Sequence, residues 1–549
     1  MLYPVLVLAV KIQMQSSTKK NLLVASCYAG TVILGMLLGP KFEKENRNAD
    51  TGRFISFSST STEKVGRILN LIEENYVDPV KTDTLQDLAI HQILKKLDPH
   101  SSYLPPVEAK KFSEVLEGNY SGIGVEYQML KDTATITLVL DKGPAARAGL
   151  KNGDQILKID EHVIAGKKLS GQEISSFIGG RSGSEIKLQV RRDGVIKPVI
   201  VRRDKIIISS IDAAYKLADR IGYVKISKFG AQTDQDFKLT LEALKGQGVQ
   251  NLILDLRGNG GGYLNAATSL ADQFLTDKKL IVYTKGEHEP RTEYLATREG
   301  IFENGKLIVL IDENSASASE IVAGAVQDLD RGIVVGRRSF GKGLVQEQFN
   351  FGDGSALNLT VARYFTPSGR SIQKPYKSGS EKYFEEVHQR LKNGELAGKK
   401  NDSVYKDNKT YKTTGGKVIF AGGGIMPDVY VPIDTTSYNH FYWDLNSKGV
   451  LDEFLYKQLI RSIHPSNPQQ LIRDFNLTDA QYQKLLGLAQ SRSIKFDKQT
   501  SLVARKAVNT ELKRLLSRFY FGNEGYYRVQ NHDDPVIAKS LEVLKRLRN

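Results

Sequence analysis

The chain has 549 residues, of which 40% are hydrophobic and 25% are charged, a composition that excludes an intrinsically disordered protein and predicts several globular domains. The formal net charge is +15, but the Lys and Arg residues are spread along the chain without an aromatic-studded basic motif, so we expect no nucleic-acid partner. The only cysteine, Cys27, lies in an apolar segment, which excludes a disulfide and a cysteine-rich zinc site from the soluble part.

That apolar segment covers residues 22–39 and follows Lys19 and Lys20. At about 1.5 Å per residue it spans roughly 27 Å, close to the thickness of a bilayer core. No small-residue cleavage site follows it before Pro40, which favours an uncleaved anchor over a cleaved signal peptide. We therefore predict an N-terminal segment (1–21), a transmembrane anchor (22–39) and a linker (40–62), with Met1 or Met14 as the start.

Residues 63–117 are predicted to form an N-terminal helical region. Apolar residues recur at helical spacing from Val65 to Ile72 and again from Leu85 to Leu94. The segment Tyr76 to Pro79 separates the two predicted helices. The segment 97–104, Leu-Asp-Pro-His-Ser-Ser-Tyr-Leu, is interpreted as a turn that packs under the active-site domain and not as a catalytic element.

Short alternating strands follow, from Ser121 to about Arg203. The segments 121–125, 143–150 and 152–157 resemble PDZ domains over about 90 residues, and we place this domain at 118–206. In a PDZ domain, glycines free backbone N–H groups to receive a peptide carboxylate, and an exposed strand edge pairs with the peptide. The resemblance implies a peptide site at Gly122, Ile123, Gly124 and Val125. The alternative is an all-β structural module without a ligand.

From 207 to 436 the pattern changes to strands that alternate with helices. Strand-like segments at 222–226, 252–256, 307–311 and 333–335 are separated by helical patterns, which predicts an α/β core. A glycine-rich stretch at 258–262 follows the second strand and precedes a helix over 264–274. A dinucleotide-binding loop would need glycine at the position of Tyr263, so we reject that interpretation.

A small-residue segment, 313–320, links the strand 307–311 to a helical pattern that begins with Ile321. Such a turn can place a serine hydroxyl at a helix N-terminus, where backbone N–H groups point outward. Ser317 and Glu320 also have the spacing of a capping box. From these residues alone the segment is either a helix cap or a nucleophile turn.

Lys342 stands between two glycines after the strand 332–336. A hairpin turn with a solvated charge is the simpler interpretation. However, none of the eight histidines falls in a triad or metal motif, so a lysine is the base available to a serine nucleophile, provided that burial lowers its pKa from ~10.4. The segment 336–342 also has the spacing of a phosphate-binding loop, but Gly343 replaces the hydroxyl residue that would hold magnesium.

Two further segments complete the chain. The charged, Lys- and Gly-rich stretch at about 376–416 is predicted to be an exposed loop or partly ordered flap. Helical patterns at 478–489 and 503–516 predict an added helical domain at 437–549.

Three of these segments, 255–262, 315–320 and 340–346, resemble signature segments of the carboxy-terminal processing peptidases, or tail-specific proteases. These are serine peptidases with a Ser–Lys dyad and an embedded PDZ domain. In that family the base follows the nucleophile by 25 positions, the separation of Ser317 and Lys342. The resemblance further implies the other site residues: Gln346 orients the lysine, Ala318 and Gly261 (or Gly262) give the oxyanion hole, and Asp328 is a possible assisting acid.

The resemblance implies a serine endopeptidase that recognises the C-terminal segment of proteins and needs no metal or cofactor. Its expected fold is a mixed-sheet α/β peptidase core with an inserted PDZ β-barrel-like domain, N-terminal helices and a C-terminal helical region. The expected location is the inner membrane, with the catalytic part in the periplasm. A non-catalytic or partner-gated PDZ scaffold at the membrane is the alternative, and a homo-oligomer or an adaptor is left open.

Overall fold

The computed structural model describes residues 64–297, 300–398, 409–434 and 436–547. The predicted anchor at 22–39 and its flanks lie outside these residues. Among the helices within them, none has the length and apolar character needed to cross a membrane. The chain divides into two units, Met1–Gln86 and Asp87–Asn549.

The described part of the first unit is helical, as the spacing predicts. Helix α2 (Lys64–Asn75) has no buried residue, and α3 (Thr82–Leu94) begins in this unit. The segment from Tyr76 to Pro79 separates them. The predicted helices and the break between them are confirmed.

In the second unit, residues from β2 (Asn119–Gly122) to β9 (Asp204–Ile207) form a separate antiparallel domain. Its sheet has the order β3-β4-β5-β7-β8, with β6 beside β5. A single apolar core, which includes Ile136, Ile156 and Leu188, lies under it. The elements are β3 (Val125–Leu130), β4 (Thr133–Val139), α5 (Pro144–Arg147), β5 (Gln155–Ile159), β6 (His162–Val163), α6 (Gly171–Ile178), β7 (Glu185–Arg192) and β8 (Val195–Arg202).

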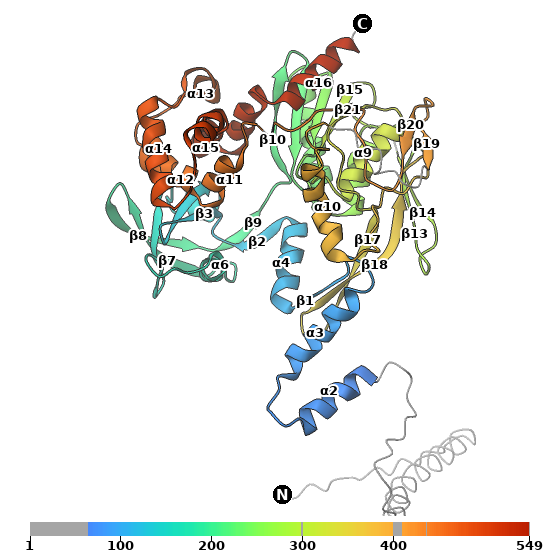
Figure 1. The fold of residues 1–549 in the computed structure, drawn as a ribbon, viewed down its shortest axis with the longest axis horizontal. Helices are drawn as coiled ribbons and strands as arrows, with labels where there is room; N and C mark the ends of the chain where they lie inside the picture. The colour runs from blue at the N-terminus through green and yellow to red at the C-terminus, as the bar shows by residue number, and fades with distance from the viewer. Residues whose placement is uncertain (1–63, 298–299, 399–408, 435, 548–549) are drawn as a thin grey trace, which may run out of the picture. The chain divides into compact units, whose positions relative to one another are not determined.

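The main core is a six-stranded sheet with the order β10-β11-β12-β15-β16-β21. Three of its strands, β10, β15 and β21, are labelled in Figure 1. Strand β10 is antiparallel to β11, and the other pairs are parallel. The bounds are β10 (Ile211–Ala218), β11 (Ile221–Ile226), β12 (Asn251–Asp255), β15 (Lys306–Ile311), β16 (Ile333–Gly336) and β21 (Val429–Tyr430). Every residue of β11 and β12 is buried, as expected for parallel strands covered on both faces.

Helices cover both faces of this sheet. On one face, α7 (Thr233–Gly246), α8 (Leu264–Asp272) and α9 (Ala318–Asp328) pack through a cluster that includes Phe237, Leu270 and Val322. On the other face, α16 (Pro535–Arg546) places Val536 and Ile537 against the sheet. The alternation of side chains along each strand supplies both cores.

A second, antiparallel sheet has the order β1-β18-β13-β14, with β17 paired to β18. Helix α4 (Pro106–Glu117) follows β1 and leads into β2. The strands are β1 (Ser102–Leu104), β13 (Leu280–Lys285), β14 (Thr292–Leu295), β17 (Leu344–Asn350) and β18 (Ala356–Phe365). The mixed-sheet α/β fold with an inserted small β-domain is confirmed.

The prediction of an exposed loop at 376–416 is wrong for its first half. Residues Ser380–Lys392 form helix α10, in which Tyr383 and Arg390 are buried. A short hairpin of β19 (Thr410–Lys412) and β20 (Val418–Phe420) follows. The charge density indicated a solvent-exposed loop, but the segment is helical and its charged residues Glu386 and Arg390 pair with each other.

The C-terminal region is helical, as predicted, and contacts both the small β-domain and the α/β core. Arg518 pairs with Glu126 of the small β-domain at 2.7 Å, and Asp534 pairs with Arg257 of the core at 2.7 Å. Gly522, with φ 65°, kinks the long helix between these contacts. The elements are α11 (His440–Ser447), α12 (Val450–Phe454), a π-helical turn (Leu455–Leu459), α13 (Pro468–Asp474), α14 (Asp479–Ser491), α15 (Lys498–His532) and α16.

Candidate active site

Three loops leave the main sheet at one edge. The glycine loop (residues 256–263) follows β12, the serine turn (312–317) follows β15, and the Lys342 loop (337–343) follows β16. Because these three strands are parallel neighbours, their carboxyl ends meet at the same edge, where α/β proteins place their ligands. The fold therefore brings together segments that are separated by up to about 80 residues in the sequence.

Ser317 is the N-cap of α9 and has φ 54° and ψ −113°. A non-glycine residue at positive φ is strained and persists only where its surroundings fix it. Asn259 of the glycine loop supplies part of that support, since its carbonyl oxygen accepts from Ala316 N–H at 3.0 Å and from Ser319 Oγ at 2.9 Å. A Cβ on Gly261 would stand 2.8 Å from the Cβ of Ser317, so the two loops touch where only glycine fits.

Glu320 and Tyr364 join the serine turn to the Lys342 loop through the backbone. One oxygen of the buried Glu320 carboxylate accepts the N–H groups of Ser317 (2.8 Å) and Lys342 (2.9 Å), and the other accepts Gly341 N–H at 2.7 Å. On the carbonyl side, the Tyr364 hydroxyl lies 3.1 Å from Ser317 O and 2.6 Å from Lys342 O. The backbones of both residues are thus fixed without use of the serine hydroxyl or the lysine ammonium group.

Burial lowers the pKa of Lys342 below its ordinary value of 10.5, and the carboxylates of Glu320 and Asp98 oppose this shift. His100, in the turn 97–104, lies in the same cleft. Burial, followed by the charge of Lys342, lowers the pKa of His100 to about 3, so this histidine is neutral at physiological pH. The lysine therefore sits in an environment that favours its neutral form.

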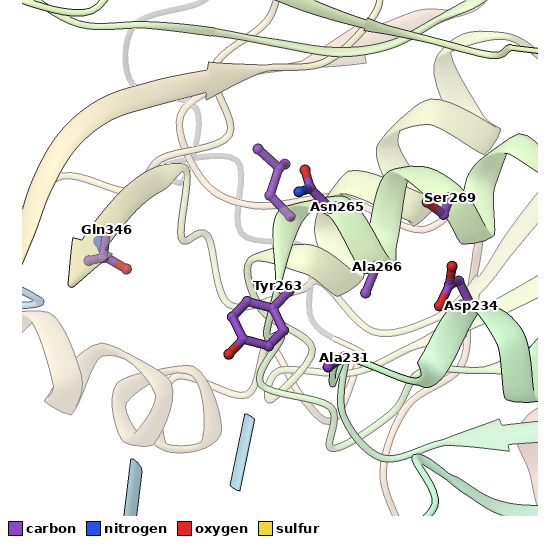
Figure 2. Close-up of a pocket in the computed structure, with 8 residues that line it drawn as sticks. Ala231, Asp234, Tyr263, Asn265, Ala266, Ser269 and Gln346 are labelled. Carbon is purple, nitrogen blue, oxygen red and sulfur yellow. The ribbon is translucent and has the colours of Figure 1, made fainter. Parts of the chain in front are cut away.

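A cleft of about 740 Å³ contains most of the predicted site. We call it the catalytic cleft. It is lined by the candidate residues Ser317, Ala318, Gly261, Lys342 and Gln346. Gln346 donates from Nε2 to Thr360 Oγ1 at 3.1 Å. A neighbouring cavity of about 380 Å³ shares Gln346, Tyr263 and Leu264 with the cleft. In Figure 2, Tyr263 lies between Gln346 and Asp234, so this cavity extends the cleft along the start of α8.

Two of the candidate residues, Gly261 and Asp328, make hydrogen bonds or ion pairs that do not serve the proposed roles. The Gly261 N–H donates to Asn259 Oδ1 at 2.9 Å, so this amide does not face the cleft as a free donor. Asp328 is buried and pairs with Arg370 at 2.7 Å, and it also accepts the Thr366 hydroxyl. It is not among the residues that line the catalytic cleft.

The predicted peptide-binding segment runs from the end of β2, which pairs with β9, to the start of β3 in the sheet of the small β-domain. Gly122 pairs with Asp204 at the end of β2, Ile123 is buried, and Val125 begins β3. Gly124 has φ 76°, a conformation that glycine adopts at no steric cost.

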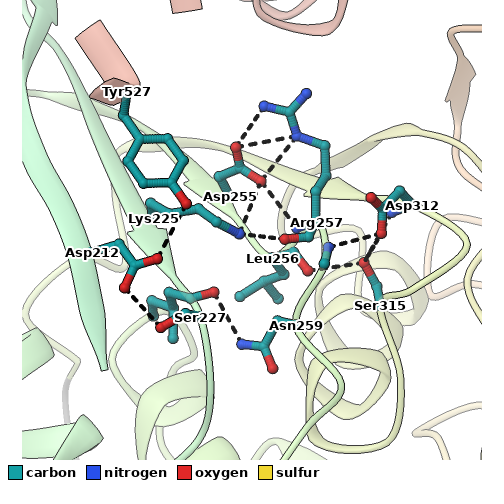
Figure 3. A network of polar contacts seen from close by, with 12 residues as sticks. Asp212, Lys225, Ser227, Asp255, Leu256, Arg257, Asn259, Asp312, Ser315 and Tyr527 are labelled. Carbon is teal, nitrogen blue, oxygen red and sulfur yellow. Dashed lines mark hydrogen bonds and ion pairs between the residues drawn. The ribbon is translucent and has the colours of Figure 1, made fainter. Parts of the chain in front are cut away.

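A buried polar network holds the glycine loop through Arg257 (Figure 3). Arg257 binds Asp255 through both carboxylate oxygens and reaches Asp534 of the C-terminal region. Lys225 donates to the carbonyl of Arg257. In the same figure, Tyr527 donates to Asp212 at 3.1 Å. The C-terminal region thus contacts the glycine loop, through the bond between Asp534 and Arg257.

Several residues of the site have no signal in the sequence that separates them from packing residues. His100 lines the cleft although its segment was interpreted as a packing turn, and Tyr364 and Asn259 were given no individual role. Phe112 and Leu116 of α4 and Lys228 also line the cleft. Among the described residues, no group of three or more His, Cys, Asp or Glu side chains is placed to hold a metal ion.

Comparison with known proteins agrees with this arrangement. The family description "Peptidase family S41" matches residues 220–379, and "PDZ domain" matches 121–202. A carboxy-terminal-processing protease of Bartonella bacilliformis is 37% identical over 318 residues, which cover 56% of this chain and 72% of that protein. A probable CtpA-like serine protease of Staphylococcus aureus is 34% identical over 313 residues, which cover 56% of this chain and 62% of that protein.

Among solved structures, a photosystem II D1 C-terminal processing protease is 25% identical with a TM-score of 0.35, over 68% of this chain and 93% of its own. The sequence matches show that this chain belongs to the carboxy-terminal-processing proteases of peptidase family S41, which are serine proteases, and that it contains a PDZ domain. The family predicted from the three signature segments is confirmed.

Proposed function

We propose that this chain is a serine endopeptidase in which Ser317 is the nucleophile and Lys342 the general base. The observation that carries the proposal is that Ser317 and Lys342 line the same cleft. Their backbone N–H groups share a single oxygen of Glu320, and burial lowers the pKa of the lysine. A neutral amine close to a strained serine turn is the arrangement that serine–lysine chemistry requires.

In the proposed reaction, neutral Lys342 takes the proton of Ser317 as Oγ bonds to the peptide carbonyl carbon. The C–N bond then breaks, and the lysine returns the proton to the leaving amine, which gives an acyl-enzyme. The same lysine then deprotonates a water molecule, which bonds to the acyl carbon. The bond to Ser317 Oγ breaks, the lysine gives the proton to Oγ, and the acid product leaves. The N–H of Ala318 and one from the glycine loop stabilise the oxyanion, each worth roughly 3 kcal/mol of the barrier.

The hydrogen bond from Gly261 to Asn259 bears on the alternative function. If Gly261 is the second oxyanion donor, its amide must turn away from Asn259 Oδ1 before catalysis. The adjacent Gly262, which also lines the cleft, is the other candidate. If Gly261 is the donor, a chain held in this conformation would bind peptides without cutting them, which is the partner-gated scaffold.

The PDZ domain and the N-terminal segment complete the proposal. We assign capture of a C-terminal peptide segment to Gly122, Ile123, Gly124 and Val125, and we place the catalytic part in the periplasm, attached to the inner membrane by residues 22–39. Gln346, held by Thr360, is assigned to orienting Lys342. Asp328 has no place in the proposed chemistry, because its contacts lie away from the cleft.

The test is cleavage of an unfolded protein with an apolar free C-terminus by the full chain in detergent. Wild type is compared with Ser317→Ala and Lys342→Ala, with folding monitored by circular dichroism. Cleavage by wild type alone supports the dyad, and kcat/KM should rise with pH as Lys342 loses its proton. A wild-type chain that binds the tail but leaves it intact supports the gated scaffold, and cleavage by Ser317→Ala rules out the proposed nucleophile.

A further inference from the structure

Helix α10 belongs to the segment 376–416, which has no part in the dyad or the PDZ domain, yet it packs directly on the Lys342 loop. Its residue Arg390 is 1% exposed. The guanidinium group donates to three consecutive carbonyl oxygens of the loop, those of Arg338 (3.0 Å), Ser339 (2.8 Å) and Phe340 (3.2 Å). Together with a bond from Nε to Glu386, the side chain donates four hydrogen bonds, one more than the three N–H donors of an ammonium group can supply.

The amide side of the same loop is held by other residues. Gly341 and Lys342 donate their N–H groups to Glu320, and Gly343 donates to Gln373 Oε1 at 2.8 Å. The loop therefore has its carbonyl groups at 338–340 fixed by Arg390 and its amides at 341–343 fixed by two acceptors. Without the arginine, the half of the loop that precedes Lys342 loses these three bonds.

A network of charges keeps Arg390 in place. Its Nε donates to Glu386, one turn earlier on α10, at 2.9 Å. Glu386 also accepts from Arg338 (3.1 Å) and from Lys374 (3.0 Å). Because buried charges are tolerated only when they are paired and hydrogen-bonded, this set fixes the angle at which α10 presents its arginine.

An aromatic cluster connects α10 to the cleft wall. Tyr383 stacks edge-on against Phe340 and His100, with ring centroids 5.6 and 5.2 Å apart, and its hydroxyl lies 2.9 Å from His100 Nε2. The Lys374 ammonium group lies 3.8 Å from the centre of the Phe340 ring. Phe340, two residues before Lys342, is thus enclosed by Tyr383, His100 and Lys374.

We infer that α10 is a positioning helix for the general base, and that Arg390 acts on catalysis by fixing the carbonyl groups of residues 338–340. This inference rests on the proposed role of Lys342. It assigns a catalytic purpose to a segment whose charge suggested a solvent-exposed loop. Arg390 does not line the catalytic cleft, so it is a positioning residue, not a catalytic one.

The experiment compares Arg390→Ala and Arg390→Lys with Gln389→Ala, the matched control, since Gln389 is exposed on the same helix and bonds only within it. We expect kcat to fall about 100-fold in both Arg390 variants, the loss typical of a small misplacement of a catalytic group. KM should change little, because substrate contacts remain. Methylguanidinium should restore part of the activity of Arg390→Ala, and Gln389→Ala should match wild type.

Hydrogen exchange of the amides at 339–343 gives a second readout that does not depend on cleavage. We expect faster exchange in the Arg390 variants than in Gln389→Ala. Wild-type kcat and wild-type exchange in a folded Arg390→Lys variant would overturn the inference. If Arg390→Ala does not fold, the test rests on the Arg390→Lys variant alone. If wild type itself fails to cleave, the proposed function fails, while exchange still decides whether Arg390 fixes the loop.

Discussion

Replacing Glu320 with glutamine should separate the positioning of the dyad from the stability of the fold. The buried carboxylate accepts four hydrogen bonds, from the N–H groups of Ser317, Gly341 and Lys342 and from the Ser339 hydroxyl at 2.5 Å. A glutamine oxygen can keep two of them, but its NH₂ group faces the other donors. An unpaired buried donor costs about 1–3 kcal/mol, so the loss is about 2–6 kcal/mol.

A second term offsets part of this loss. Burial raises the pKa of Glu320 from 4.5 to about 7, so the ionised form carries a cost of about 3 kcal/mol, at about 1.4 kcal/mol per pKa unit. Glutamine avoids that cost. We therefore expect the free energy of unfolding to fall by no more than about 3 kcal/mol. We expect kcat to fall about 100-fold, because glutamine leaves either the pair Ser317 and Lys342 or the pair Gly341 and Ser339 without its acceptor, and both pairs position the Lys342 loop.

The assay is steady-state cleavage at pH 6 and pH 8, with urea unfolding in parallel. The Glu320 pKa of about 7 means that the wild-type carboxylate is ionised at pH 8 and largely protonated at pH 6. The ratio of wild-type to Glu320→Gln activity should therefore be larger at pH 8. Glu347→Gln, on the exposed side of β17, is the control. A folded Glu320→Gln variant with wild-type kcat at pH 8 would refute the proposed role of Glu320.

Three further substitutions test the surroundings of the site. Gly261→Ala should reduce kcat at least about 10-fold, because a Cβ there would stand 2.8 Å from the Cβ of Ser317 and the backbone has φ 107°. Single-turnover rates measure this effect, and an unchanged rate would contradict it. Asp328→Asn should lower the free energy of unfolding in urea by about 3 kcal/mol, since Arg370 loses its buried carboxylate partner. The pH–rate profile should stay in place, and a displaced profile would restore Asp328 as an assisting acid. Asp534→Asn should lower the melting temperature by several degrees, because Arg257 keeps only one of its two carboxylate partners; an unchanged melting temperature would show that this contact adds no stability.

Much of the core is predictable because its signals are local. The run 307–311 is apolar throughout, as a buried parallel strand requires, and it corresponds to β15 (Lys306–Ile311). The glycines before residue 264 and the small residues before Ala318 mark the points where strands end and helices begin. Once the strands are known to be parallel neighbours, the meeting of Ser317 with Lys342 at one edge follows.

The residues that position the dyad are not predictable in this way, because tertiary packing alone brings them to the site. His100 comes from a turn more than 200 residues before Lys342, and its ring reaches the cleft through contacts with Tyr383. Helix α10 shows the limit of composition as a guide. Charged residues are rarely buried unless they are paired, and here the buried Arg390 is paired with Glu386, which is also paired with Arg338.

The electrostatics of Lys342 combine two opposing effects, and Asp98 offers a way to separate them. Burial favours the neutral amine that the proposed reaction needs, whereas the carboxylates of Glu320 and Asp98 favour the ammonium form. Unlike Glu320, Asp98 does not bond to the dyad. It accepts the N–H groups of His100 and Ser101 at 2.7 and 2.9 Å and the Ser101 hydroxyl at 2.6 Å.

Asparagine at position 98 can keep Oδ1 as the acceptor for both amides while it removes the charge. Loss of a nearby negative charge destabilises the ammonium form, so the pKa of Lys342 should fall further. We expect Asp98→Asn to move the rising limb of kcat/KM to lower pH without lowering its plateau, and Asp353→Asn, in an exposed turn, to leave the limb in place. A limb that moves to higher pH, or does not move, would mean that the titrating group is not a lysine close to Asp98.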